Sequence, residues 1–299
     1  MRLCLPACLC VCAGAGAVES TRRNNEVQSL YSSGAAIAVT QNKGLKRGED
    51  VVVTPESNGV FNVTLLMDGH GGQGIMKRSL DLQQGLLNAC RVAADWPKCA
   101  REAVQNFQDR ARQMQYRGGA TLLALLTEER SSRVAFAWAG DSMAILVKQG
   151  RTAFRTSLHT TELESEVQRI RGHPEYKYEF HDGYLCSTDP GAGCVMPTRG
   201  LGDVDLEPAG FLAVPDTSEF MDLAPGDFVL MASDGLWDVL SEEEVLARTQ
   251  VGSPEKNLAT AEALAEAAVQ GWARRYGPGE ADDVSLLLCQ PVGEEKAEL

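Results

Sequence analysis

The chain has 299 residues, of which 44% are apolar and 23% charged, so it is long enough to bury a full hydrophobic core. Its formal net charge of −13 at pH 7 argues against nucleic acid as a partner, because a phosphate backbone requires a basic surface. The same charge fits an acidic site that is neutralised by cations.

The amino terminus is an apolar segment of ambiguous role. Residues 1–20 read MRLCLPACLCVCAGAGAVES, with a basic residue at position 2 and small residues at 15–17, where a signal peptidase could cut. The apolar run is too short for a comfortable membrane span. We expect residues 1–22 to be a signal peptide or a disordered start, followed by a domain at 23–292 and a tail at 293–299. The expected location is cytoplasmic, with the secretory pathway as the alternative if residues 1–17 are a signal peptide.

The nine cysteines fall into two groups. Four lie in the first twelve residues, and the body of the chain holds Cys90, Cys99, Cys186, Cys194 and Cys289. These five include no CxxC pair, and an odd, unpatterned set is typical of a reduced compartment. We therefore expect ordinary thiols.

Short apolar, β-rich runs dominate the pattern and alternate with longer helical windows. Strands are predicted at 35–40, 51–54, 60–67, 120–127, 134–139, 143–148, 227–232 and 284–289, and helices at 75–90, 96–115, 161–171, 241–250 and 255–276. The strands come in antiparallel-looking pairs, which favours packed sheets flanked by helices over a doubly wound parallel sheet. Residues 172–197 mix Gly, Pro, Tyr and His without a period and are predicted to be irregular.

Acidic residues recur at the ends of the predicted strands. Asp68 and Asp234 close apolar strands and precede a glycine, and Asp141 follows a glycine after a third strand. The pairs Glu49–Asp50 and Asp282–Asp283 stand where two further strands begin. One such acid is usually only a turn residue. If several meet at one edge of the sheets, their carboxylates repel each other unless cations neutralise them.

All these donors are oxygen atoms, without a Cys or His partner at zinc spacing, so the expected cation is Mg²⁺ or Mn²⁺. Two such ions that share a carboxylate can lower the pKa of a water molecule and hold a phosphate oxygen. The pattern therefore indicates phosphoryl hydrolysis.

Six motifs carry a resemblance to a known family. They are DGHGG at 68–72, GGATLLALL at 118–126, AGDS at 139–142, TRGLGD at 198–203, MASDGLWDVLSEEEV at 231–245 and ADDVSLLL at 281–288. In order and spacing, from about residue 35 to residue 290, the chain resembles the metal-dependent protein phosphatases, the type 2C serine/threonine phosphatases. The resemblance implies an α+β fold, a four-layer α/β/β/α sandwich of two antiparallel sheets flanked by helices, with two Mg²⁺ or Mn²⁺ ions at one edge.

The resemblance also implies roles for individual residues. The implied metal ligands are Asp68 as the carboxylate that bridges both ions, the Gly69 carbonyl and Glu49 on one ion, Asp234 and Asp282 on the other, and Asp141 on a weaker third ion. A hydroxide between the two metals would attack phosphorus in line, and His70 would protonate the departing Ser or Thr oxygen as general acid.

Some positions depart from the family pattern. The family's phosphate-binding arginine, four residues before the glutamate, is Leu45 here, and Lys46 and Arg47 lie nearby. Of the two, Arg47 has the planar fork suited to phosphate. Asp283 replaces the usual asparagine and adds negative charge beside Asp282. Residues 172–197 occupy the place of the family's variable flap, where we expect substrate preference to reside.

The expected function is therefore that of a protein serine/threonine phosphatase, a monomer acting on phosphoprotein substrates, with no nucleic-acid partner and no transmembrane span. The alternative is a pseudophosphatase that acts as a binding module on the same fold. The altered arginine block favours this alternative. Against it stands the presence of Glu49, Asp68, Asp234 and Asp282, because a degenerate member is expected to lose metal carboxylates.

Overall fold

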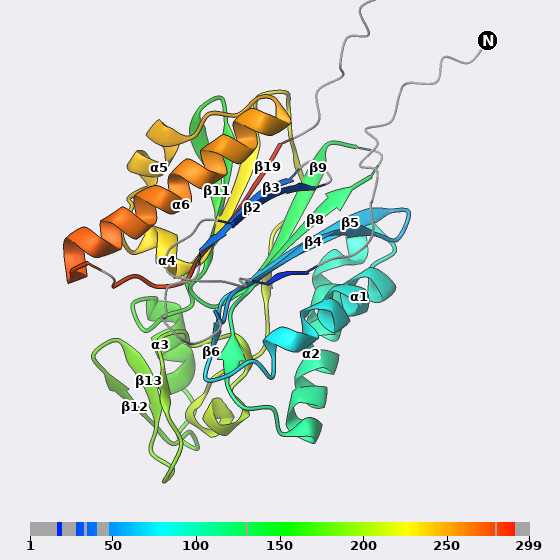
Figure 1. Ribbon diagram of the computed structural model, residues 1–299. Coiled ribbons are helices and arrows are strands. Elements are labelled where there is room, and N and C mark those ends of the chain that lie inside the picture. The colour runs from blue at the N-terminus through cyan, green and yellow to red at the C-terminus, as the bar shows by residue number, and fades with distance from the viewer. Residues whose placement is uncertain are drawn as a thin grey trace, which may run out of the picture.

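Two antiparallel sheets pack face to face (Figure 1). The computed structural model describes residues 17–19, 28–32, 35–40, 48–129, 131–278 and 280–290. The first sheet has the order β1 (Ala17–Glu19), β4 (Val51–Ser57), β5 (Phe61–Met67), β8 (Leu122–Glu128), β9 (Arg133–Ala139) and β16 (Asp216–Thr217), and β17 (Met221–Asp222) also pairs with β9. The second has the order β11 (Arg151–Arg155), β10 (Met143–Lys148), β18 (Phe228–Ala232), β19 (Val284–Cys289), β3 (Ala35–Thr40) and β2 (Gln28–Ser32).

Both faces of the central strands are buried, because successive side chains of a strand point to opposite sides of its sheet. In β4, for example, Val52 packs between the two sheets, whereas Val51 and Val53 pack toward the helices. In β5, Leu66 likewise faces the other sheet. These strands therefore appear in the sequence as continuous apolar runs rather than as strict alternations.

Helices cover the outer face of each sheet (Figure 1). The first sheet is covered by η1 (Met76–Arg78), α1 (Ser79–Ala89), η2 (Ala93–Asp95) and α2 (Trp96–Met114), and the second by α4 (Asp234–Trp237), α5 (Glu242–Arg248) and α6 (Pro254–Tyr276). The predicted α/β/β/α sandwich is confirmed. Among the described residues, none of the helices combines the length and apolar character that a membrane crossing requires.

The predicted strands and helices are present, and their ends differ by a few residues from the prediction. The strand β11 was not predicted, because its side chains alternate between exposed and half-buried positions and give no apolar run. At the start of α5, Ser241 and Glu244 form a reciprocal capping box, which satisfies backbone N–H groups at the helix end.

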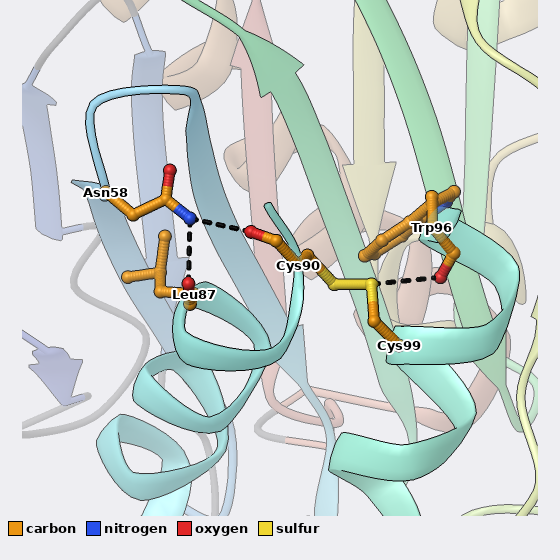
Figure 2. The surroundings of a disulfide bond; sticks show 5 residues. All are labelled: Asn58, Leu87, Cys90, Trp96 and Cys99. Atoms are coloured by element: carbon orange, nitrogen blue, oxygen red, sulfur yellow. Dashed lines mark hydrogen bonds between the residues drawn. A yellow bond between two sulfur atoms is a disulfide. The ribbon is translucent and has the colours of Figure 1, made fainter. Parts of the chain in front are cut away.

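The expectation of free thiols was wrong for four cysteines. One disulfide joins Cys90, directly after α1, to Cys99 in the first turn of α2 (Figure 2). The Asn58 side-chain amide donates to the carbonyls of Leu87 and Cys90, at 2.7 and 2.8 Å, so a turn between β4 and β5 holds the same helix end. The pairing was not recognisable from the sequence, because the spacing of two cysteines does not reveal which residues the fold brings together.

The second disulfide lies in the segment expected to be irregular. Residues 178–195 instead form a small antiparallel sheet of β12 (Tyr178–His181), β13 (Tyr184–Ser187) and β14 (Cys194–Val195), and Cys186 is bonded to Cys194 across β13 and β14. The strands are short and face solvent on one side, so they lack the apolar runs that marked the core strands. We call residues 172–197 the flap.

The flap is anchored by a helix with a buried carboxylate. In α3 (Glu164–Arg171), the side chain of Glu166 is 1% exposed and accepts hydrogen bonds from Arg169, Arg199 and Thr198. Burial raises the pKa of Glu166, but the hydrogen bonds from Arg199 and Arg169 outweigh it and lower the pKa to about 2. The contacts tie α3 to the TRGLGD segment, which follows the flap.

We expect Glu166→Gln to lower the free energy of unfolding by about 3 kcal/mol at pH 7, because the half-buried guanidinium groups of Arg169 and Arg199 lose the buried carboxylate that they share, and Arg199 keeps only Asp216 as an anionic partner. The folded-state pKa lies below the ordinary value of 4.5, so this contribution is present above pH 4.5 and is lost as the pH falls toward 2. Urea unfolding at pH 7 and at pH 3.5 should show the difference shrink at the lower pH. The exposed Glu164→Gln on the same helix is the control, and an equal loss in both variants would contradict the argument.

Candidate metal centre and active site

The acidic strand ends meet at one edge of the sandwich. In the first sheet, Val51 of β4 pairs with Met67 of β5, so Asp50 and Asp68 leave their strands at the same place. In the second sheet, β18 and β19 are neighbours and bring Asp234 close to the residues that precede Val284. Antiparallel pairing thus places the end of one strand beside the start of the next.

These residues line one pocket of about 370 Å³. Its wall contains the side chains of six aspartates together with His70, and these acids are Asp50, Asp68, Asp141, Asp234, Asp282 and Asp283. The pocket therefore brings together the predicted site residues Asp68, Asp141, Asp234 and Asp282, and it also holds Gly69.

Burial, together with the close approach of the carboxylates, raises their pKa values. Burial and the charges of Asp50 and Asp234 hold the pKa of Asp68 well above its usual range. Burial and the charge of Asp283 do the same for Asp50. The pKa of Asp141 rises to about 7, through burial and the charge of Asp234. Such shifts are expected where like charges share a small volume.

Asp68 is held by a paired threonine and a glycine. The Asp68 N–H donates to Thr121 Oγ1 at 3.1 Å, and the Thr121 N–H donates to the Asp68 carbonyl at 2.8 Å. The next residue, Gly69, has no room for a side chain, because a Cβ there would overlap the Glu49 carbonyl and the Met76 side chain. The backbone of the DGHGG turn is therefore held by Thr121 at Asp68 and packed closely against Glu49 and Met76 at Gly69.

Asp50, which we did not predict as a site residue, lines the pocket together with the predicted aspartates. Glu49 Oε1 accepts from the Gly72 N–H at 2.9 Å, and Glu49 is not among the residues that line the pocket, whereas Asp50 is. The period of two explains the difference, because Asp50 shares its face with Val52, which points toward the second sheet. Applied to the sequence, the same alternation indicates Asp50 as a further acid of the pocket, and the role of Glu49 as a metal ligand stays a prediction.

Asp283 shows how the two sheets are joined at this edge. Its Oδ2 accepts a hydrogen bond from the Glu49 N–H at 2.8 Å, which links the start of β19 to the start of β4. The side chain is buried with 4% exposure. The residue that departs from the family's asparagine therefore contributes to the wall of the pocket and to the contact between the sheets.

His70 belongs to a separate, three-stranded sheet and lines the pocket. That sheet has the order β15 (Leu201–Gly202), β7 (Gly119–Ala120) and β6 (Gly69–His70). His70 Nε2 lies 2.7 Å from Oδ2 of Asp203, which follows β15. Burial lowers the pKa of His70, but the hydrogen bond and charge of Asp203 outweigh it, so that the pKa is raised. Sequence reasoning missed Asp203, which lies far from His70 along the chain.

The flap supplies the opposite rim of the pocket. The rim residues are Tyr184, Cys194, Val195, Met196 and Pro197. Tyr184 and Met196 are 40% and 39% exposed, so apolar surface stands beside the acidic floor. Lys46 and Arg47, the predicted phosphate-binding residues, lie outside the described residues, and within the described ranges the lining includes neither Lys nor Arg.

Comparisons with known proteins find similarity to one family. A family model described as "Protein phosphatase 2C" matches residues 48–274. The chain is 26% identical to "Probable protein phosphatase 2C 61" of Arabidopsis thaliana, over 94% of this chain and 95% of the relative. It is 29% identical to an Arabidopsis thaliana "Protein kinase and PP2C-like domain-containing protein", over 76% of this chain, and spans only 34% of that relative's length.

Solved structures show the same fold. The serine-threonine phosphatase 2C from Toxoplasma gondii superposes with a TM-score of 0.67 at 16% identity, over 92% of this chain and 98% of that one. The catalytic domain of the serine/threonine phosphatase PstP, in complex with two manganese ions, superposes with a TM-score of 0.54 at 18% identity, over 86% and 96% of the two chains. With the family model covering most of the chain, this protein belongs to the protein phosphatase 2C family.

Proposed function

We propose that this protein is a metal-dependent phosphatase that hydrolyses phosphoserine and phosphothreonine in proteins, with Mg²⁺ or Mn²⁺ in the aspartate pocket. The observation that carries the proposal is the convergence of six aspartates and His70 in one pocket at the sandwich edge. The family membership and the two manganese ions in the PstP structure support it.

The residues of the pocket fit a pair of hard cations. The Asp68 carboxyl group lies close enough to those of Asp50 and Asp234 to interact with both, and a hydrogen bond between two carboxyl groups requires a shared proton. Asp50 Oδ2 is buried and has no hydrogen-bond partner among the described residues. The described residues contain no ready-made cluster of three metal-binding side chains, so cation binding would replace these shared protons and separate the carboxylates.

Asp68 would help to hold both ions, the Gly69 carbonyl and Glu49 would hold one of them, and Asp234 and Asp282 would hold the other. We add Asp50, which lines the pocket, as a further candidate ligand, and Glu49 Oε1 also accepts a hydrogen bond from the Gly72 N–H. Asp141 remains the proposed ligand of a weaker third ion. When bound, the ions would lower the pKa of water and neutralise charge on the phosphoryl oxygens.

The chain's own residues then account for binding and proton transfer. His70 lines the pocket and can donate a proton to the departing serine or threonine oxygen, as a general acid. The exposed Tyr184 and Met196 offer apolar contact to the peptide around the phosphorylated residue. Arg47, with Lys46 beside it, is the proposed phosphate-binding residue and lies outside the described residues.

Asp68→Asn should lower kcat by roughly 10³-fold, because it removes the ligand shared by both ions and with it several kcal/mol of transition-state stabilisation. The assay is hydrolysis of 4-nitrophenyl phosphate and of phosphoserine, phosphothreonine and phosphotyrosine peptides, with Mn²⁺ titrated and then removed by EDTA. Wild type should lose activity with EDTA, and the phosphotyrosine peptide should be a poor substrate.

Asp222→Asn, an exposed aspartate on β17 away from the pocket, is the matched control and should keep full activity. Full activity of Asp68→Asn would remove Asp68 from the mechanism. A wild-type protein that is inactive with every divalent metal would favour the alternative of a binding module.

Asp68→Asn should also raise the melting temperature of the metal-free protein. The raised carboxylate pKa values mean that stability is greatest when these groups are protonated, and that it falls as the pH rises from their ordinary value of 3.8 to about 6 to 7. Scanning calorimetry in EDTA at pH 8 and pH 5 should show a larger gain for the variant at pH 8. Added Mn²⁺ should stabilise wild type more than the variant, by mass action. A lower melting temperature of the variant at pH 8 would contradict carboxylate repulsion.

We further propose that the protein matures in an oxidising compartment, which is the secretory alternative to the expected cytoplasmic location. The two disulfides support this proposal, because disulfides persist where thiols are not kept reduced. Residues 1–16, which contain four other cysteines and most of the apolar segment, lie outside the described residues.

The test is disulfide mapping of the full chain, expressed in eukaryotic cells and alkylated before lysis. Trypsin cuts after Lys98 and separates Cys90 from Cys99, while cleavage before Asp189 separates Cys186 from Cys194. We expect both pairs to remain joined until a reductant is added, in protein recovered from the secretory fraction. Alkylated thiols at all four positions in recovered protein would contradict the proposal.

A further inference from the structure

Asp203 has one side-chain contact that points to a role in the reaction. Its Oδ2 lies 2.7 Å from His70 Nε2, and its side chain is only 6% exposed, against 35% for His70. The imidazole therefore has a buried, acidic side, while the residue as a whole lines the pocket. A carboxylate in this position fixes the ring orientation and engages one of the two ring nitrogens.

The smaller sheet holds the two groups at this distance. Gly119 of β7 pairs with His70 on one side and with Gly202 on the other, so a single strand separates the two segments. A Cβ on Gly119 would overlap the Asp203 carboxylate. The absence of a side chain at this position leaves the space that the Asp203–His70 contact occupies.

The backbone of Asp203 is held from the other side by α2. The fully buried Gln108 accepts from the Gly202 N–H and donates to the Gly202 carbonyl, both at 2.8 Å. Asp203 has φ = 43°, in the left-handed region, and its N–H donates to the Gly118 carbonyl at 3.0 Å. A residue keeps this conformation where surrounding contacts determine it.

Capping of a helix does not explain why residue 203 carries a carboxylate. Asp203 stands at the N-cap position of η3 (Val204–Ala209), where an aspartate commonly accepts a hydrogen bond from the helix backbone. Its side chain makes no such capping hydrogen bond. The carboxylate is directed to His70 instead.

We propose that Asp203 is a positioning residue that orients the His70 imidazole for proton donation to the leaving oxygen. The inference rests on the proposed function and deepens it. The ring nitrogen not held by Asp203 gives its proton to the oxygen as the phosphorus–oxygen bond breaks. The ring is then neutral and keeps its N–H bond to Asp203, which stays a carboxylate throughout.

The test compares substrates whose leaving groups differ in their need for a proton. Asp203→Asn should lower kcat for phenyl phosphate by about 10- to 100-fold, because general acid catalysis contributes about 10²- to 10⁴-fold and a misoriented ring loses part of it. The kcat for 2,4-dinitrophenyl phosphate, whose leaving group needs no proton, should change less than about twofold. KM for both esters should stay the same.

In a His70→Gln background, Asp203→Asn should cause no further loss, because the two residues act as a unit. Asp203→Gly provides a second variant, since glycine adopts the left-handed conformation without strain, and it should show the same substrate dependence.

Asp205→Asn, exposed on the adjacent helix η3, is the control and should match wild type. Circular dichroism establishes that each variant is folded.

Equal loss for both esters, or an additive loss in the His70→Gln background, would show that Asp203 only supports the fold and would overturn the proposal. Unchanged kcat for phenyl phosphate in the folded variants would also overturn it. Failure of the proposed function is a separate outcome, because wild type would then hydrolyse neither ester with Mn²⁺.

Discussion

Mutual repulsion between buried carboxylates is the physical constraint on the pocket at the sandwich edge. Asp68 lies between Asp50 and Asp234 at the sandwich edge, and burial together with the neighbouring charges holds the pKa values of all three above the ordinary range. A fold can maintain such a cluster only where tight packing around it keeps the carboxylates from moving apart. Here the acids extend from central strands whose two faces are both buried, so the apolar core fixes the positions of groups that would otherwise move apart.

The site divides into a rigid floor and an attached rim. The floor belongs to the two core sheets and to the small sheet that carries His70, and its backbone is fixed by paired contacts such as that between Asp68 and Thr121. The rim belongs to the flap, which has its own apolar cluster beneath it. The anchoring carboxylate of Glu166 contacts Arg199 of the segment that leads to Asp203, so the flap and the side of the pocket that holds His70 share one support.

The sequence was sufficient for the fold and for most of the acids, because long apolar runs marked the strands and the acids stood directly at their ends. Asp68 and Asp234 were found in this way. Asp50 was missed as a pocket residue, because the prediction of Glu49 followed the family resemblance and not the alternation of side chains along β4. The Asp203–His70 contact could not be predicted, because it depends on how three two-residue strands pair, and such strands are too short to produce a pattern. The disulfides depend in the same way on spatial proximity.

The bond between Cys186 and Cys194 has a practical consequence for laboratory work with this protein. Cys194 belongs to the rim of the pocket, and the bond joins it to the neighbouring strand of the flap. Storage buffers that contain dithiothreitol would open this covalent link without altering any aspartate. Preparations that differ only in their thiol content would then differ in the covalent structure of this rim, while the aspartates on the floor of the pocket stay the same.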